Sequence, residues 1–97
     1  MDKDKIERKL EEKKVYIKRV FHVREIGIFG SFIRGEQTES SDIDVLVEFE
    51  KGHKDFFNYM RLKYYLEELL EGKIDLVIKN AVKPRLRERI FSEVEYV

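Results

Sequence analysis

The chain has 97 residues, and 20 Lys and Arg balance 20 Asp and Glu, so the formal net charge is zero. This balance argues against a protein that binds nucleic acid or a membrane through bulk positive charge. The absence of Cys excludes disulfides, thiolate metal sites and Cys nucleophiles. The longest uncharged run, Ile26 to Ile33, is far too short to span a bilayer, and the charged N-terminus lacks an apolar signal core. We therefore expect a cytoplasmic protein with one domain over residues 1–97.

The first half of the chain alternates between helical and extended patterns. Apolar residues recur at a 3.6-residue period from Asp4 to Val23, which predicts an amphipathic helix. Glu25 to Phe29 is typical of a short strand, and the following Ser31 to Gly35 predicts a short helix. After a polar loop from Glu36 to Ser41, the Val and Ile residues of Asp42 to Phe49 alternate as in a second strand.

The second half repeats this alternation and completes the prediction of the fold. Lys54 to Glu71 predicts a second long helix, closed by Gly72 in the usual C-terminal position. Lys73 to Lys79 predicts a third strand, and Pro84 suits the first residue of a helix running to about Phe91. Val94 to Val97 is expected to be a brief extended tail. The fold class is therefore α/β (α+β), with a small mixed sheet of about three strands covered by helices.

Three aspartates carry the most informative chemistry. Residues i and i+2 of a strand face the same side, so Asp42 and Asp44 present two carboxylates side by side. Asp75 lies between apolar residues in the third predicted strand, which is a costly place for a lone charge. If the two strands are neighbours, the three carboxylates form a cluster suited to two-metal phosphoryl or nucleotidyl transfer with Mg²⁺.

The turn between the first strand and the short helix is a candidate phosphate site. A strand that runs into Gly30-Ser31 and then a helix leaves free backbone N–H groups at a helix N-terminus. Gly30 permits close approach of the backbone, and the Ser31 hydroxyl can donate to a phosphate oxygen. Arg34 either reaches the aspartates or a phosphate, or forms a structural salt bridge.

The segment from Gly30-Ser31 to Asp42-Ile43-Asp44, with Asp75 later, resembles the DNA polymerase β-like nucleotidyltransferase superfamily. The small size and the C-terminal helix resemble its minimal nucleotidyltransferase (MNT) branch. The resemblance covers nearly the whole chain. It implies that Gly30 and Ser31 bind the nucleotide phosphates, that Asp42 and Asp44 bind Mg²⁺, and that Asp75 helps to bind metal and activates the acceptor hydroxyl.

Members of the MNT branch resemble antitoxins that transfer AMP from ATP to a Tyr hydroxyl of a HEPN-domain toxin. The resemblance therefore implies an Mg²⁺-dependent protein adenylyltransferase that uses about two ions and ATP in a hetero-oligomer with a HEPN toxin. About twenty residues follow the third predicted strand, too few for a substrate-binding domain, so we expect another macromolecule to present the acceptor. The alternatives are an antitoxin that neutralises its partner by contact alone, and a stand-alone transferase acting on a small molecule or an RNA end.

Three other features are open on sequence alone. An aromatic stripe on the long helix is either core or an interface. Arginines of the C-terminal helix form a solvated face, a triphosphate clamp or a contact with an acidic partner. The segment from Glu36 to Glu50 holds six acids and no base, which suggests an acidic centre. The stripe comprises Phe56, Phe57, Met60 and Tyr64, and the arginines are Arg85, Arg87 and Arg89.

Overall fold

The computed structural model describes residues 1–97. The helices are α1 (Lys3–Phe21), α2 (Ser31–Arg34), α3 (Phe56–Leu70) and α4 (Pro84–Glu93), with a 3₁₀ turn, η1 (Lys79–Ala81), before α4. The strands are β1 (Val23–Phe29), β2 (Ile43–Phe49), β3 (Ile74–Ile78) and β4 (Glu95–Tyr96). The predicted order of helices and strands is confirmed, and each predicted bound lies within two residues of the observed one. None of the helices combines the length and the apolar character that a bilayer crossing requires.

The strands form one mixed sheet in the order β3-β2-β1-β4. β2 is antiparallel to β1 and parallel to β3, which confirms the predicted fold class. The sheet has a fourth strand where the sequence predicted only a tail. β4 pairs antiparallel with β1 through Gly27 opposite Tyr96 and Ile28 opposite Glu95. A strand of two residues is too short to show alternation, so its pairing depends on where α4 returns the chain.

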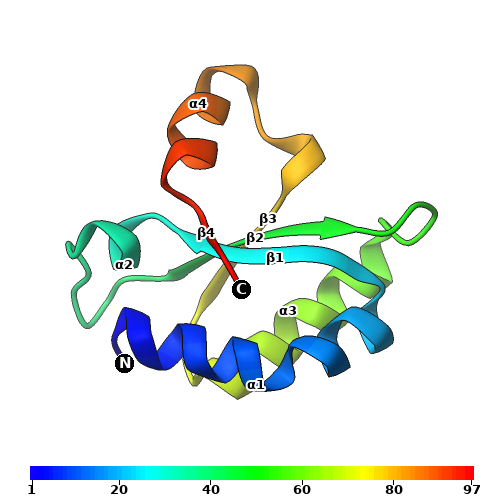
Figure 1. Cartoon of the computed structure of the whole chain (residues 1–97), viewed down its shortest axis with the longest axis horizontal. Coiled ribbons are helices and arrows are strands. Elements are labelled where there is room, and N and C mark those ends of the chain that lie inside the picture. The colour runs from blue at the N-terminus through cyan, green and yellow to red at the C-terminus, as the bar shows by residue number, and fades with distance from the viewer.

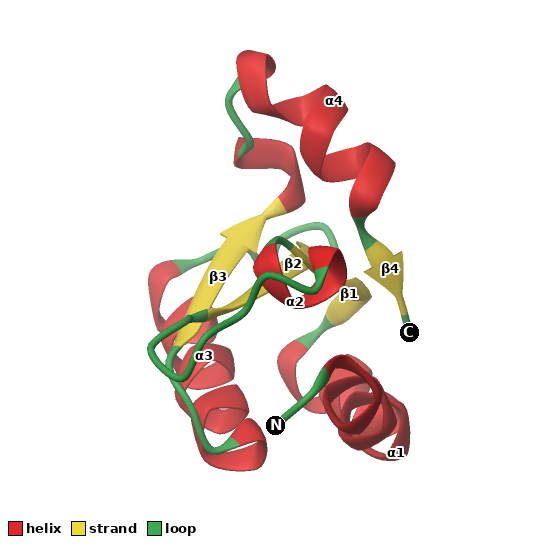
Figure 2. Ribbon diagram, turned by 90° about the vertical axis from the view of Figure 1, so that its left-hand side faces the viewer, coloured by secondary structure: helices red, strands yellow, loops and turns green.

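The two faces of the sheet are covered differently. α1 and α3 lie together on one face, and α4 lies on the other (Figures 1 and 2). The cluster beneath α1 and α3 holds 17 buried residues, whereas the cluster beneath α4 holds four. The smaller cluster consists of Phe29, Leu46, Val82 and Ile90. The larger cluster includes Ile6, Leu10, Ile26, Val45, Leu62 and Leu66.

Alternation along β2 links the main core to the opposite face. Ile43, Val45 and Val47 belong to the main cluster, so the intervening Asp44 and Leu46 face α4. A shift of the strand by one residue would exchange the two sets, and it would bury a carboxylate in the main core. The hydrophobic core therefore fixes the side of the sheet on which Asp44 lies.

Helix α3 settles whether the aromatic stripe is core. Its N-cap Asp55 accepts a hydrogen bond of 2.9 Å from the backbone N–H of Asn58. Phe56, Phe57 and Tyr64 are 70%, 77% and 61% exposed, so the core interpretation of these three residues is wrong. The helix ends at Leu70, and Glu71 rather than the predicted Gly72 closes it in the left-handed conformation (φ 53°).

Gly27 provides a test of the β4 pairing. A Cβ there would lie 2.8 Å from the carbonyl oxygen of Glu95 and 3.0 Å from Val94 Cγ2, so β4 would have to move. We expect Gly27→Ala to lower the free energy of unfolding by about 1–3 kcal/mol in urea denaturation. Gly72→Ala is the matched control because the nearest atom to its added methyl group is 3.6 Å away. Equal losses in the two variants would contradict this assignment.

Candidate active site

Two carboxylates meet where β2 and β3 run side by side. Asp44 and Asp75 are direct partners in the parallel register, so their side chains leave the same face of the sheet. Asp44 is partly buried and Asp75 is exposed. Both side chains line a cavity of about 390 Å³ that residues of α4 close from the opposite side.

The proximity of the two carboxylates changes the protonation of Asp44. Burial, followed by the charge of Asp75, raises the pKa of the Asp44 carboxyl to about 6. A hydrogen bond shared with Asp75 and the charge of Asp42 act in the same direction, whereas the backbone N–H of Ser31 lowers the pKa. The ionised pair is therefore repulsive, and a proton or a cation between the two carboxylates relieves this repulsion.

The positions of Asp42 and Asp75 correct two expectations from the sequence. Asp42 is exposed and precedes β2, which begins at Ile43, so it is not the strand residue that the sequence predicted. Its charge nevertheless acts on Asp44. Asp75 lies in β3 as predicted but is exposed, so the expected cost of burying its charge does not arise.

The donor set fits a magnesium ion better than a softer metal. Asp44 and Asp75 offer only carboxylate oxygens, and Mg²⁺ commonly uses one or two carboxylates together with water and substrate phosphates. No three His, Cys, Asp or Glu side chains are grouped closely enough to hold a metal by themselves. The geometry thus fits an ion that takes its remaining ligands from water and substrate, and the participation of Asp42 and a second ion stay predictions.

The Gly30-Ser31 turn lies directly against Asp44. Gly30 has a φ of 79°, and a Cβ there would collide with the Asp44 carboxylate, so only glycine fits. Ser31 begins α2, as predicted. The backbone N–H of Gly30, however, donates a 2.9 Å hydrogen bond to Oε1 of Glu93. The expected phosphate cradle therefore has one of its N–H groups already paired.

Arg34 takes the structural alternative that the sequence left open. Its Nη1 donates to both carboxylate oxygens of Glu93, at 3.1 and 3.2 Å, and its Nε donates to Glu36 at 2.8 Å. Arg34 also lines the cavity beside Asp44 and Asp75 but forms no salt bridge with either. It holds Glu93 of α4 close to the Gly30-Ser31 turn.

Sequence reasoning missed Glu93, which does not line the cavity but contacts two residues that do, Gly30 and Arg34. It stands eight residues after Arg85 and four after Arg89, a spacing that places all three on one face of a helix. This pattern was visible in the sequence, but the partners of Glu93 were not. The contacts to Gly30 and Arg34 join residues about sixty positions apart, which no local pattern reveals.

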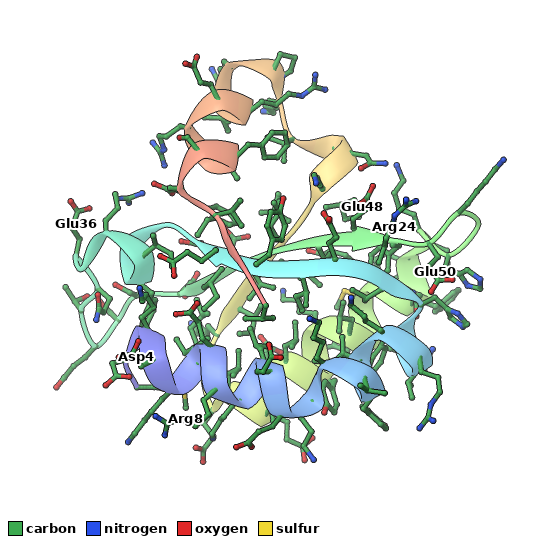
Figure 3. All side chains as sticks on the ribbon, viewed as in Figure 1. Asp4, Arg8, Arg24, Glu36, Glu48 and Glu50 are labelled. Atoms are coloured by element: carbon green, nitrogen blue, oxygen red, sulfur yellow. The ribbon has the colours of Figure 1, made fainter.

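The acidic segment from Glu36 to Glu50 does not form one centre. Glu36 and Glu50 lie at opposite ends of the molecule, far from a common site (Figure 3). Glu36 is neutralised by Arg34. Of the acidic residues in this segment, only Asp44 and Asp42 therefore belong to an acidic centre, together with Asp75 of β3.

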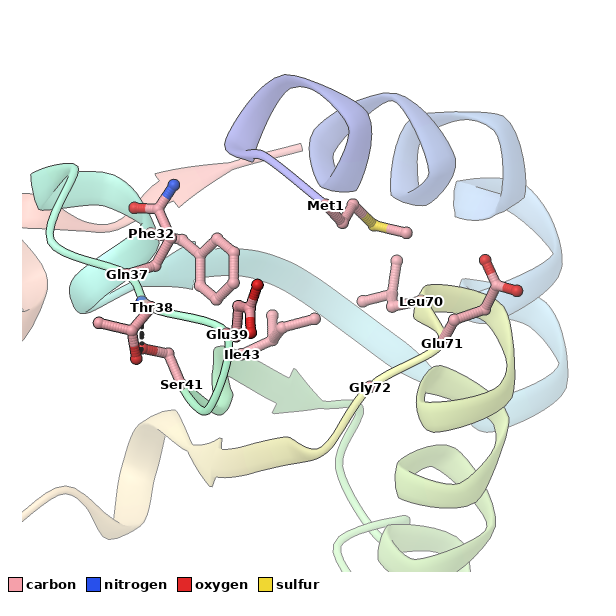
Figure 4. Close-up of a pocket in the computed structure, with 10 residues that line it drawn as sticks. All are labelled: Met1, Phe32, Gln37, Thr38, Glu39, Ser41, Ile43, Leu70, Glu71 and Gly72. Carbon is pink, nitrogen blue, oxygen red and sulfur yellow. Dashed lines mark hydrogen bonds between the residues drawn. The ribbon is translucent and has the colours of Figure 1, made fainter.

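A second cavity, of about 430 Å³, lies on the opposite side of β2. It is bounded by Met1, by the loop before β2 and by the end of α3 (Figure 4). Ile43 lines this cavity, whereas the next residue, Asp44, lines the other one. None of the three aspartates reaches it, so the cavity beneath α4 is the candidate active site.

Comparison with known proteins identifies the family. Residues 3–97 match the model of the nucleotidyltransferase domain. The chain belongs to the nucleotidyltransferase domain family. The expectation of a nucleotidyltransferase is therefore confirmed, because the match covers nearly the whole chain.

Several individual nucleotidyltransferases are similar to this chain. The protein adenylyltransferase MntA of Thermococcus cleftensis is 42% identical over 94 residues, which cover 97% of this chain and 94% of that protein. A solved structure named as a minimal nucleotidyltransferase superposes with a TM-score of 0.84 at 36% identity, covering 98% of this chain and 95% of the other. Each of these two similarities spans almost the full length of this chain and of the protein compared with it.

Two solved structures of toxin–antitoxin complexes also share the fold. A chain of a toxin–antitoxin complex with AMP-PNP gives a TM-score of 0.71 at 25% identity, covering 89% of this chain and 70% of the other. A chain of the complex of a tri-AMPylated Shewanella oneidensis HEPN toxin with its MNT antitoxin gives 0.66 at 20% identity, covering 94% and 70%. The second similarity shows the fold alone.

The raised pKa of Asp44 predicts how stability depends on pH. The folded state holds this proton more tightly than the unfolded state, so metal-free protein should lose stability as the pH rises from 3.8 to about 6. After allowance for solvent screening of a half-buried group, the loss is about 1 kcal/mol. Asp44→Asn should remove this loss and be the more stable protein at neutral pH.

Urea unfolding in the presence of a chelator, at pH values on both sides of 6, measures the effect. Glu7, whose pKa is also raised by burial, contributes the same slope to the parent protein and to Asp44→Asn. The informative quantity is therefore the difference between the two proteins. A difference that does not change with pH would contradict the assignment to Asp44.

Proposed function

We propose that this chain is an Mg²⁺-dependent protein adenylyltransferase that transfers AMP from ATP to a Tyr hydroxyl of a HEPN-domain toxin and thereby acts as its antitoxin. The observation that carries the proposal is the in-register pair Asp44 and Asp75 beside the Gly30-Ser31 turn. The name of the MntA relative and the AMP-PNP in a related toxin–antitoxin structure support ATP as the donor. The HEPN partner is supported by the motif resemblance and the shared fold.

In this proposal, Asp42, Asp44 and Asp75 would hold Mg²⁺, and the ion would supply positive charge to the phosphates and to the leaving pyrophosphate. Gly30 and Ser31 hold the phosphate chain against Asp44. The acceptor oxygen attacks the α-phosphorus, the bond to the bridging oxygen of the β-phosphate breaks, and pyrophosphate leaves with that electron pair. The Asp75 carboxylate accepts the proton of the acceptor hydroxyl.

The exposure of Asp75 supports an acceptor on another macromolecule. β3 is an edge strand of the sheet, and Asp75 is open to solvent there, so a side chain of a partner can approach it.

We also propose that residues 1–97 act as one domain in the cytoplasm and bind the toxin in a hetero-oligomer. Contact alone is the second candidate function, because Phe56 and Phe57 form an exposed aromatic pair with ring centroids 5.8 Å apart.

Intact-mass spectrometry of the partner tests the chemistry. Incubation with protein, ATP and Mg²⁺ should add mass in units of AMP to the HEPN partner. Asp44→Asn should slow this addition by about 100-fold or more, since metal-held carboxylates contribute several kcal/mol to the transition state. Glu50→Gln is a control of equal charge change at the end of the molecule remote from the cavity.

Toxin neutralisation in cells separates the two candidate functions. The double variant Asp42→Asn/Asp44→Asn should fail to neutralise the toxin if AMP transfer is required. Full neutralisation by this variant, at normal protein levels, would instead establish contact as the function. Absence of any added mass with the parent protein would refute the proposed transfer.

A further inference from the structure

The cavity has a basic wall opposite its aspartates. Arg85 and Arg89 lie four residues apart on α4, so they project from the same face of the helix, and both line the cavity that Asp44 and Asp75 line from the sheet. Lys83 lines its rim. The sequence left open whether the arginines of this helix form a solvated face. All three are exposed, and two of them also line the cavity.

These two guanidinium groups have no partner in the chain. Neither Arg85 nor Arg89 takes part in any salt bridge or side-chain hydrogen bond, although two carboxylates line the same cavity. Arg87 differs, because its Nε donates to the carbonyl oxygen of Val82 at 3.2 Å and it does not line the cavity. Arg34 differs as well, since Glu36 and Glu93 already pair with it. The cavity thus presents two solvent-exposed positive charges that are free to take an anion.

Two contacts hold the C-terminal half of α4 (Pro84–Glu93) against the sheet. Ile90 is buried with Phe29 and Leu46 of the sheet. One turn further on, Glu93 accepts hydrogen bonds from Gly30 and Arg34, and only 15% of its side chain is exposed. Arg85 and Arg89 are therefore held on a helix that is attached to the same turn that adjoins Asp44.

We propose that Arg85 and Arg89 bind the β- and γ-phosphates of the nucleoside triphosphate, and the pyrophosphate as it leaves. Glu93 is a positioning residue that holds α4 at the required place. The inference rests on the proposed function for the identity of the ligand. It follows from charge, because the carboxylates on the sheet side of the cavity repel phosphates unless a cation lies between them, whereas the two guanidinium groups on the α4 side attract them. Planar guanidinium groups match phosphate oxygens and form the stronger, charge-assisted hydrogen bonds.

Calorimetric binding of ATP and of AMP, each with Mg²⁺ and without any partner protein, tests the role of the arginines. Arg85→Gln and Arg89→Gln should each weaken ATP binding by about tenfold, which is the loss of one charge-assisted contact. AMP binding should change by less than about twofold, because AMP lacks the two outer phosphates. Arg87→Gln is the control, since it removes the same charge from the same helix outside the cavity.

Three results would overturn the assignment. They are equal weakening of ATP and AMP, an effect of Arg87→Gln as large as that of the other two variants, and parent protein that binds ATP no more tightly than AMP. Failure of the proposed function would give a result different from these three. If the parent protein prefers ATP through Arg85 and Arg89 but adds no AMP to a partner, the ligand assignment stands and the transfer reaction does not.

The test of Glu93 needs a measured quantity that would stay unchanged if the residue had only a structural role. Glu93→Ala should lower the ratio of ATP affinity to AMP affinity, because α4 loses its attachment to the turn. Glu93→Gln should restore part of this ratio, since its carbonyl oxygen still accepts from the N–H of Gly30. A ratio that rises in Glu93→Ala would overturn the positioning role and would show that the carboxylate competes with a phosphate. An unchanged ratio with lowered thermal stability would show a structural tie only.

Discussion

The fold holds the carboxylates of Asp44 and Asp75 side by side, although the two negative charges repel each other, and the chemistry of the site depends on this constraint. The two carboxylates are brought together because β2 and β3 pair in parallel with Asp44 opposite Asp75. The burial of Ile43, Val45 and Val47 in the main core opposes a shift of β2 by one residue, which would turn Asp44 to the other face. The apolar core on one face thus holds a like-charge pair on the other. Burial and the charge of Asp75 together raise the pKa of the Asp44 carboxyl to about 6, and a divalent cation between the two carboxylates would offset their repulsion at neutral pH.

The face that carries this pair is covered by little apolar material. Four buried residues lie beneath α4, compared with 17 beneath α1 and α3. Polar contacts add to this attachment. Glu93 of α4 contacts Gly30 and Arg34, and Lys79 of the preceding η1 turn contacts Glu25 of β1 at 2.9 Å. The large core therefore provides most of the apolar packing, while the side of the sheet that holds the aspartates relies in addition on specific charged contacts.

The sequence predicted most of this fold because its signals are local. Amphipathic periodicity marked α1 and α3, alternation marked β2, and Pro84 marked the start of α4. β4 was missed because two residues carry no period, and its pairing with β1 depends on the path of α4. The aromatic stripe could not be assigned by composition, since burial depends on what packs against a helix, and nothing in the chain covers Phe56 and Phe57.

The candidate site was predictable to the extent that its residues lie on regular elements. The spacing of Asp42 and Asp44, and the position of Asp75 on the next strand, were enough to anticipate that carboxylates meet. Sequence could not show that Asp42 falls outside the strand, or that Asp75 is exposed at an edge. The contacts of Glu93 are long-range and polar, and neither hydrophobic periodicity nor motif spacing encodes such pairings.

The most direct test of this account is an NMR titration of the aspartate side-chain carboxyl carbons, with and without Mg²⁺. In metal-free protein the Asp44 carboxyl should titrate near its raised pKa of about 6, and saturating Mg²⁺ should move this titration to clearly lower pH, because the ion favours the ionised form. An Asp44 carboxyl that titrates in the ordinary range of an exposed aspartate, or whose titration does not move with Mg²⁺, would contradict the claim that this carboxylate pair is built around a cation.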